Sequence, residues 1–191
     1  LALWAGPPQA ALVAGLQPMP LRCRLAALEP WWCALPWSAS LAGKRVLVVH
    51  PFARSIEQQW RRRQQLFANP AVLPDFELIT LVPPQTLAGA TQGYASWDQA
   101  LDQLQRQVAA LRFDVALLGC GAYGLPLAAA IADSGRVALH VGGALQLLFG
   151  IRGRRWEASP RFEQLMNSSW VRPAREETPA GADQVDGRCY W

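Results

Sequence analysis

Four short apolar runs, rich in β-branched residues, recur along the middle of the chain at residues 45–50, 77–82, 114–119 and 137–141. Each run is nearly continuous in apolar character and does not alternate with polar residues. This pattern is typical of strands that are buried on both faces, as they are in parallel sheets. The sequence therefore predicts four parallel strands.

Segments with helical spacing separate these strands, and we expect helices over residues 55–68, 96–111 and 125–133. Ser55 and Ser96 are each followed three residues later by a glutamine, which is the spacing of a capping box at a helix start. Repeated strand–helix alternation implies right-handed crossovers between the strands. The predicted class is therefore α/β, a Rossmann-like three-layer domain with a mainly parallel sheet.

The two ends of the chain differ from this alternating middle. Residues 1–43 are rich in proline and tryptophan and are expected to pack on the same domain. The first residue is Leu1, which is compatible with a truncated segment. Residues 44–160 form the predicted Rossmann-like core. Residues 161–191 hold a predicted helix near 161–166 and a tail that ends in bulky apolar residues, so we expect this tail to dock on the domain. The tryptophans of the first segment are Trp4, Trp31, Trp32 and Trp37.

Composition narrows the classes of partner. The 191 residues are 51% hydrophobic and 17% charged, which are values typical of a globular domain. The net charge of +4 comes largely from arginine, but the run at 61–63 falls on a predicted helix with an apolar opposite face, so we expect a solvated surface and no nucleic-acid partner. No apolar run approaches the length of a membrane span. The four cysteines lack metal-ligand spacing and are expected to be reduced thiols of a cytoplasmic protein.

A glycine-rich turn joins the third predicted strand to the third predicted helix. Gly119, Gly121 and Gly124 form a G-x-G-x-x-G string in the strand–turn–helix context in which it favours phosphate binding at a helix N-terminus. We therefore expect these glycines and Tyr123 to contact a nucleotide. The alternative is that the glycines only let the strand and helix pack closely. Classical NAD or NADP binding is disfavoured, because no acidic residue ends the next strand.

A second small-residue bend follows the fourth predicted strand. Gly142 and Gly143 lie at the same edge of the sheet as the first turn and are expected to share in nucleotide binding. His140 and Gln146 flank the bend as candidate contacts to a sugar or base. For His140, the competing interpretation is a buried histidine whose role is structural.

Three further side chains complete the candidate site. His50 precedes a proline at the end of the first strand, which makes it a weak catalytic candidate that alternatively binds through polar contacts or is structural. Arg152 and Arg155 lie on a glycine-flexed loop and suit a diphosphate, because the planar guanidinium pairs with phosphate oxygens. The alternative is an ordinary surface loop.

Several of these stretches together resemble an uncharacterised bacterial family associated with polysaccharide biosynthesis. That family is in turn distantly similar to glycosyltransferases of the GT-D fold. The resemblance implies a nucleotide-sugar ligand bound by the two glycine bends. It also implies a divalent metal held by an Asp-x-Glu motif, but no such motif ends a predicted strand, so we expect no metal site in this chain. The matching stretches are residues 43–52, 114–124, 140–150, 152–156 and 187–191.

The resulting expectation is a glycosyltransferase-like domain that binds a nucleotide-activated sugar at the carboxyl edge of a parallel sheet. Two alternatives remain. One is a noncatalytic nucleotide- or sugar-binding module of the same fold. The other is an NAD(P)-type Rossmann enzyme, which the missing acidic residue disfavours.

Overall fold

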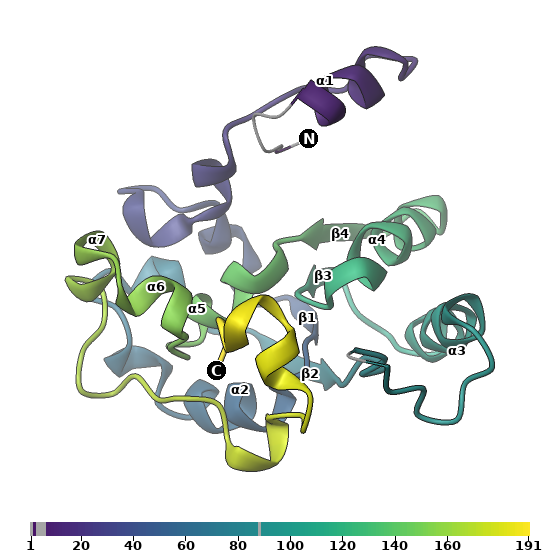
Figure 1. Cartoon of the computed structure of the whole chain (residues 1–191). Helices are drawn as coiled ribbons and strands as arrows, with labels where there is room; N and C mark the ends of the chain where they lie inside the picture. The colour runs from purple at the N-terminus through teal and green to yellow at the C-terminus, as the bar shows by residue number, and fades with distance from the viewer. Residues whose placement is uncertain (1, 3–6, 88) are drawn as a thin grey trace.

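The computed structural model describes residue 2, residues 7–87 and residues 89–191. Its centre is a four-stranded, all-parallel sheet with the strand order β2-β1-β3-β4 (Figure 1). All four predicted strands are confirmed to within a residue or two at their ends. The strands are β1 (Arg45–Val49), β2 (Glu77–Leu81), β3 (Val115–Leu118) and β4 (Val137–His140).

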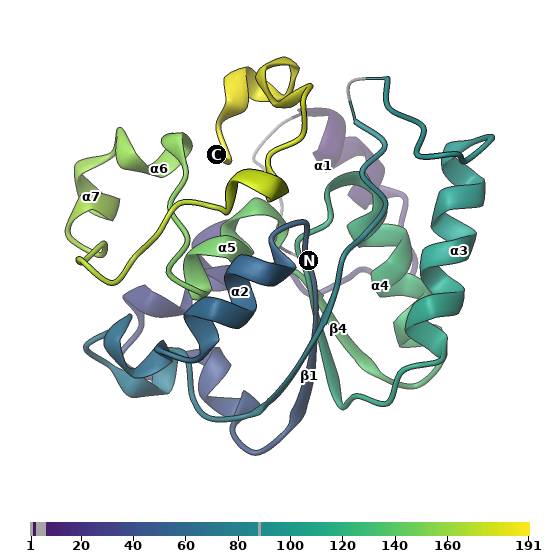
Figure 2. The same ribbon diagram turned by 90° about the horizontal axis from the view of Figure 1, so that it is seen from below.

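Helices cover both faces of this sheet, so the domain has the predicted three layers (Figure 2). Helices α3 and α4 lie on one face, and α2 and α5 lie on the other with the C-terminal segment. The helices are α1 (Pro7–Ala14), α2 (Ala53–Trp60), α3 (Trp97–Ala109), α4 (Gly124–Asp133), α5 (Leu145–Leu148), α6 (Arg154–Glu157) and α7 (Pro160–Glu163).

The two central strands divide their side chains between two hydrophobic cores. Successive strand residues point to opposite faces, so Val46 and Val48 pack in one core while Leu47 and Val49 pack in the other. All four are fully buried. Strands β2 and β4 are the edges of the sheet and are only partly buried. The continuous apolar pattern therefore indicates burial on both faces for β1 and β3, and only partial burial for β2 and β4.

Helix α2 differs from its prediction at both ends. It begins at Ala53, because the Ile56 N–H already bonds the Phe52 carbonyl at 2.9 Å, and it ends at Trp60. Ser55 is therefore inside the helix and does not cap it. Its hydroxyl instead bonds the Glu177 carboxylate and accepts the Ala174 N–H at 2.9 Å. The serine that was expected to start the helix thus ties it to the C-terminal segment.

Helix α3 begins as predicted. Ser96 accepts the Gln99 N–H at 3.1 Å as the N-cap. Leu104 and Val108 on the same helix are buried in the core beside α4. Trp97, the first helical residue, remains 41% exposed. Its position at the start of the helix leaves it free to line the site described below.

The N-terminal segment is partly integrated with the domain. Trp31 is buried in the core of the α2 face, and Trp32 and Trp37 pack against that core. Helix α1 lies at the periphery, away from the sheet (Figure 1). Trp4 lies outside the described residues.

The C-terminal segment packs on the same face of the sheet as α2. The predicted helix at 161–166 is shorter in the structure, where α7 ends at Glu163. Trp191 is 7% exposed and packs edge-on against Phe52, with 5.9 Å between the ring centroids. Its indole N–H donates to the Glu177 carbonyl at 3.1 Å. The last residue of the chain is thus part of the core.

Candidate ligand-binding site

A pocket of about 250 Å³ opens at the carboxyl edge of the sheet, where the strand order reverses between β1 and β3. Open α/β sheets bind ligands at this switch point, because the loops that leave the two neighbouring strands diverge there. The loops after β1, β2, β3 and β4 all contribute to the lining, and the C-terminal tail closes one side. A pocket is therefore present at the edge of the sheet where the sequence predicts a site.

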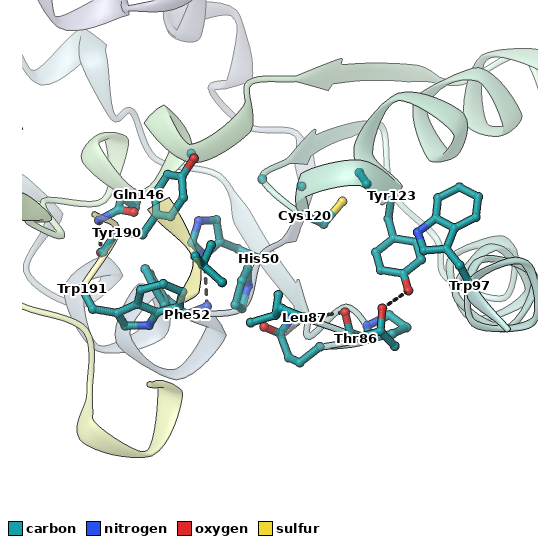
Figure 3. Close-up of a pocket in the computed structure, with 18 residues that line it drawn as sticks. His50, Phe52, Thr86, Leu87, Trp97, Cys120, Tyr123, Gln146, Tyr190 and Trp191 are labelled. Carbon is teal, nitrogen blue, oxygen red and sulfur yellow. Dashed lines mark hydrogen bonds between the residues drawn. The ribbon is translucent and has the colours of Figure 1, made fainter. Parts of the chain in front are cut away.

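Aromatic side chains form two opposite walls of this pocket (Figure 3). Phe52, Tyr190 and Trp191 make one wall, and Tyr123 and Trp97 make the other. The last two rings are stacked, with centroids 5.2 Å apart and planes only 8° from parallel. The distance between them is typical of aromatic stacking, which holds both rings in a fixed orientation.

Between the aromatic walls, small and apolar residues make up much of the lining, and uncharged polar side chains add hydrogen-bonding groups. His50, Gln85, Thr86 and Gln146 contribute side chains, and the Thr86 hydroxyl bonds the Tyr123 hydroxyl. Among the described residues that line the pocket, none is lysine, arginine, aspartate or glutamate. The pocket thus offers stacking and hydrogen bonds but no side-chain charge to neutralise a phosphate.

His50 lies between the two aromatic walls and is held as a neutral hydrogen-bond donor. The ring is 3% exposed, and burial lowers its pKa to about 3. Its Nδ1 accepts the Phe52 N–H at 3.0 Å, so the proton of the neutral ring is on Nε2. Among the described residues the ring bonds through Nδ1 and no hydrogen bond of Nε2 is found, and the residue lines the pocket. His50 can therefore donate to a ligand, whereas a general base would need a free acceptor nitrogen.

Cys120 lines the same pocket as His50, and the two residues follow the central strands β3 and β1. Burial raises its pKa to about 12, so it is a thiol at neutral pH. An activated cysteine needs a neighbour or helix N-terminus that lowers the thiol pKa. A catalytic cysteine–histidine dyad has a thiolate beside a protonated imidazole. Here the thiol of Cys120 stays protonated and the ring of His50 stays neutral.

Two of the three glycines in the first turn make room for histidine rings. A Cβ atom on Gly119 would lie 2.5 Å from the His50 ring, and one on Gly124 would lie 2.1 Å from the His140 ring. Gly121 has a φ of 56° and open space around it. The turn continues as a 3-10 helix from Gly121 to Tyr123, whose first N–H groups have no partner within the helix. Gly121 and Tyr123 line the pocket, while Gly124 is turned to the packing side.

The second bend lies beside the first, as predicted from the parallel sheet. A Cβ atom on Gly119 would approach the Gly142 carbonyl to 3.0 Å. Gly142 has a φ of 70°, and Gly143 lines the pocket, although a Cβ on it would meet the Tyr190 ring at 2.3 Å. His140 is outside the described lining, and burial lowers its pKa.

Gln146 reaches the pocket but its amide nitrogen is already engaged. This nitrogen lies 3.1–3.3 Å from the carbonyl oxygens of Ile151, Arg152 and Tyr190. Gln146 is fully buried, and its Oε1 has no partner among the described residues. The side chain thus holds the tail against the loop after α5, with one acceptor left unused.

The two arginines expected at a diphosphate are directed elsewhere. The Arg152 guanidinium donates to the Trp170 carbonyl at 2.8 Å. The Arg155 guanidinium donates to the Tyr190 hydroxyl at 3.0 Å and pairs with Asp186 at 3.2 Å. Neither arginine is among the described residues of the lining. Both hold the tail in place.

The structure offers no metal centre at this edge. In the described ranges, no group of three or more His, Cys, Asp or Glu side chains is placed to hold a metal ion. The chain does contain one Asp-x-Glu string, Asp75-Phe76-Glu77. Glu77 begins β2, so this string lies at the amino edge of the sheet, opposite to the pocket. Asp75 pairs there with Arg63 at 2.6 Å.

Most of the aromatic wall was missed by sequence reasoning. The sequence predicts a helix over residues 96–111 without placing Trp97 at a site, and it predicts only that the tail ending in Tyr190 and Trp191 docks on the domain. The available signals were the exposed position expected at a helix start and the bulky end of the chain. Neither signal says which edge of the sheet these side chains reach.

Comparison of the chain with protein-family models, with curated proteins and with solved structures found no match. No helix in the described part of the chain has both the length and the apolar character that crossing a membrane requires.

Proposed function

We propose that this domain binds a small molecule through its nucleoside part, in the pocket at the carboxyl edge of the sheet. The observation that carries this proposal is an uncharged lining between two aromatic walls. A nucleobase has two π-faces for stacking and an edge of hydrogen-bonding groups, and it carries no charge at neutral pH. His50 Nε2–H and Thr86 are suitable partners for that edge.

The size of the pocket supports a single ring system with its sugar. Sites for drug-sized ligands usually measure roughly 300–1,000 Å³. A volume of about 250 Å³ is below this range and is too small for a dinucleotide. A nucleoside, alone or at the end of a larger ligand, is the better fit.

A nucleotide-activated sugar carries such a nucleoside, so the glycosyltransferase-like activity expected from the sequence stays a prediction. The groups in the pocket favour binding over catalysis, because His50 is a neutral donor and Cys120 a protonated thiol. The glycosyltransferase-like activity is tested separately, by measuring the release of nucleoside diphosphate from a nucleotide sugar with and without manganese.

The binding proposal is tested by calorimetric titration with uridine, cytidine, adenosine and guanosine. The informative variant is Trp97→Ala, because Trp97 lines the pocket, is 41% exposed and forms the outer ring of the stack with Tyr123. Loss of a stacking partner costs about 1–3 kcal/mol per base, roughly a 5- to 150-fold loss of affinity. Ala122→Phe, at an exposed lining position, is expected to block the pocket.

Leu125→Ala is the matched control. Leu125 is 63% exposed on the neighbouring helix and does not line the pocket, so its truncation should leave affinity unchanged. The proposal is wrong if the wild-type protein binds none of the four nucleosides. It is also wrong if Trp97→Ala and Leu125→Ala bind equally well.

A further inference from the structure

A second, wider concavity lies between α6 and the C-terminal segment, which are side by side in both views (Figures 1 and 2). It measures about 620 Å³ and is separate in chemistry from the pocket above. Four arginines line it, from three parts of the chain, against one aspartate. We call it the arginine cleft. The arginines are Arg154, Arg172, Arg175 and Arg188.

Two of these arginines are already paired with carboxylates. Arg172 pairs with Glu157, and Arg188 lies 3.7 Å from Asp183, the aspartate of the lining. Arg154 and Arg175 have no ion pair and no side-chain hydrogen bond with any described residue, and both are exposed. The cleft therefore has an excess of positive charge with unused donors.

We propose that the arginine cleft binds a compact, multiply charged phosphate group such as a diphosphate. Each guanidinium is a planar fork of donors that matches two phosphate oxygens at once. Like charges brought together repel, so the two unpaired arginines of the cleft, Arg154 and Arg175, are held at a cost that a bound polyanion would remove. The hydroxyl of Thr178 in the same lining adds one more donor.

The shape of the cleft favours a compact anion over a nucleic-acid strand. Nucleic-acid surfaces present basic groups along a stripe or groove, with aromatic rings exposed for stacking. Here the arginines converge on one concavity, and Trp191, the aromatic residue of the lining, is 7% exposed. This proposal does not depend on the nucleoside pocket, since no arginine is shared between the two sites.

The test is calorimetric titration of the full chain with inorganic pyrophosphate at low and moderate salt. Arg154→Gln and Arg175→Gln each remove a charge without removing an intramolecular contact, so both variants should fold normally. Each substitution removes a hydrogen bond between charged groups. Its contribution to the binding free energy corresponds to a loss of pyrophosphate affinity of about tenfold. Their double variant should weaken it further.

Arg112→Gln is the charge-matched control. Arg112 is exposed just before β3, at the amino edge of the sheet, and has no described ion pair. This variant should bind pyrophosphate as the wild type does. The proposal is overturned if wild-type protein does not bind pyrophosphate, or if Arg112→Gln weakens binding as much as Arg154→Gln. It is also overturned if a single-stranded oligonucleotide displaces pyrophosphate from the wild type and binds the double variant more weakly than the wild type, because the cleft would then be a nucleic-acid site.

Discussion

Protonation of His50 should make the stability of this domain depend on pH. The ring is buried, its Nδ1 accepts the Phe52 N–H, and its pKa is lowered to about 3 from a usual value near 6.5. In the unfolded chain the ring takes up a proton below about pH 6.5, whereas in the folded chain it stays neutral. The unfolded state therefore binds more protons between these two pKa values, and stability falls as the pH falls through this range.

The size of the effect follows from the shift. One pKa unit corresponds to about 1.4 kcal/mol of difference between the protonation states. At pH 5 the unfolded-state pKa is about 1.5 units above the pH, so His50 should lower the free energy of unfolding by about 2 kcal/mol relative to pH 7.5. For a protein of this size, that is a shift of about 1 M in the midpoint of urea unfolding.

The assay is urea unfolding between pH 5 and pH 7.5, followed by tryptophan fluorescence. His50→Asn is the informative variant, because an asparagine oxygen can occupy the place of Nδ1 and still accept the Phe52 N–H. It should remove about 2 kcal/mol of the pH dependence. His140→Asn is the matched control, since His140 is the other histidine and its pKa is also lowered, but from a less buried position.

Two results would refute this reasoning. The first is a wild-type stability that is flat between pH 5 and pH 7.5. The second is a His50→Asn variant that keeps the full pH dependence while His140→Asn loses it. Either result would mean that His50 is charged or exposed in the folded protein, and the neutral donor at the floor of the pocket would be lost with it.

Three substitutions test the packing around the site by urea unfolding at pH 7.5. Ser55→Ala removes the buried hydroxyl that joins α2 to Glu177 and should cost about 1–3 kcal/mol; no loss would show that this contact does not hold the tail. Gln146→Met leaves buried carbonyls unpaired and should cost at least about 2 kcal/mol, while a neutral result would contradict its anchoring role. Leu104→Ala should lower the free energy of unfolding by about 2–5 kcal/mol, because Leu104 is buried in the core. The exposed Leu125→Ala should lower it by less than about 0.5 kcal/mol. Equal losses in the two variants would contradict the assignment of Leu104 to the core.

The sheet was predictable because burial on both faces leaves a strong trace in a sequence. Leu47 and Val49 face α3 and α4 while Val46 and Val48 face α2, so all four positions of β1 after Arg45 are apolar. The start of α2 was not predictable in the same way. Ser55 has the local features of an N-cap, but a carboxylate from 122 residues further along the chain competes for its hydroxyl. A contact of that range leaves no local signal.

The candidate site was predictable in position and not in chemistry. Parallel strands bring their carboxyl ends to one edge, and His50, Gly119 and Gly143 line one pocket there, while their role in binding stays a prediction. The direction of each side chain depends on what packs against it. Arg155 was expected to face a diphosphate, but it lies on the ring of Tyr190, with its guanidinium carbon 4.8 Å from the ring centroid. Tyr190 reaches Arg155 only because the C-terminal segment packs against the domain.

Trp191 gives the tail a role in both proposed sites, because it lines the nucleoside pocket and the arginine cleft. The lowered pKa of His50 shows how strongly the floor of the pocket disfavours charge. An arginine placed there would lose its hydration without a fixed partner, whereas the arginines of the cleft remain solvated on the other side of Trp191. A ligand that carries both a neutral ring and an anionic group must therefore keep its charge outside the pocket, and the cleft, which shares Trp191 with the pocket, offers arginines to receive it.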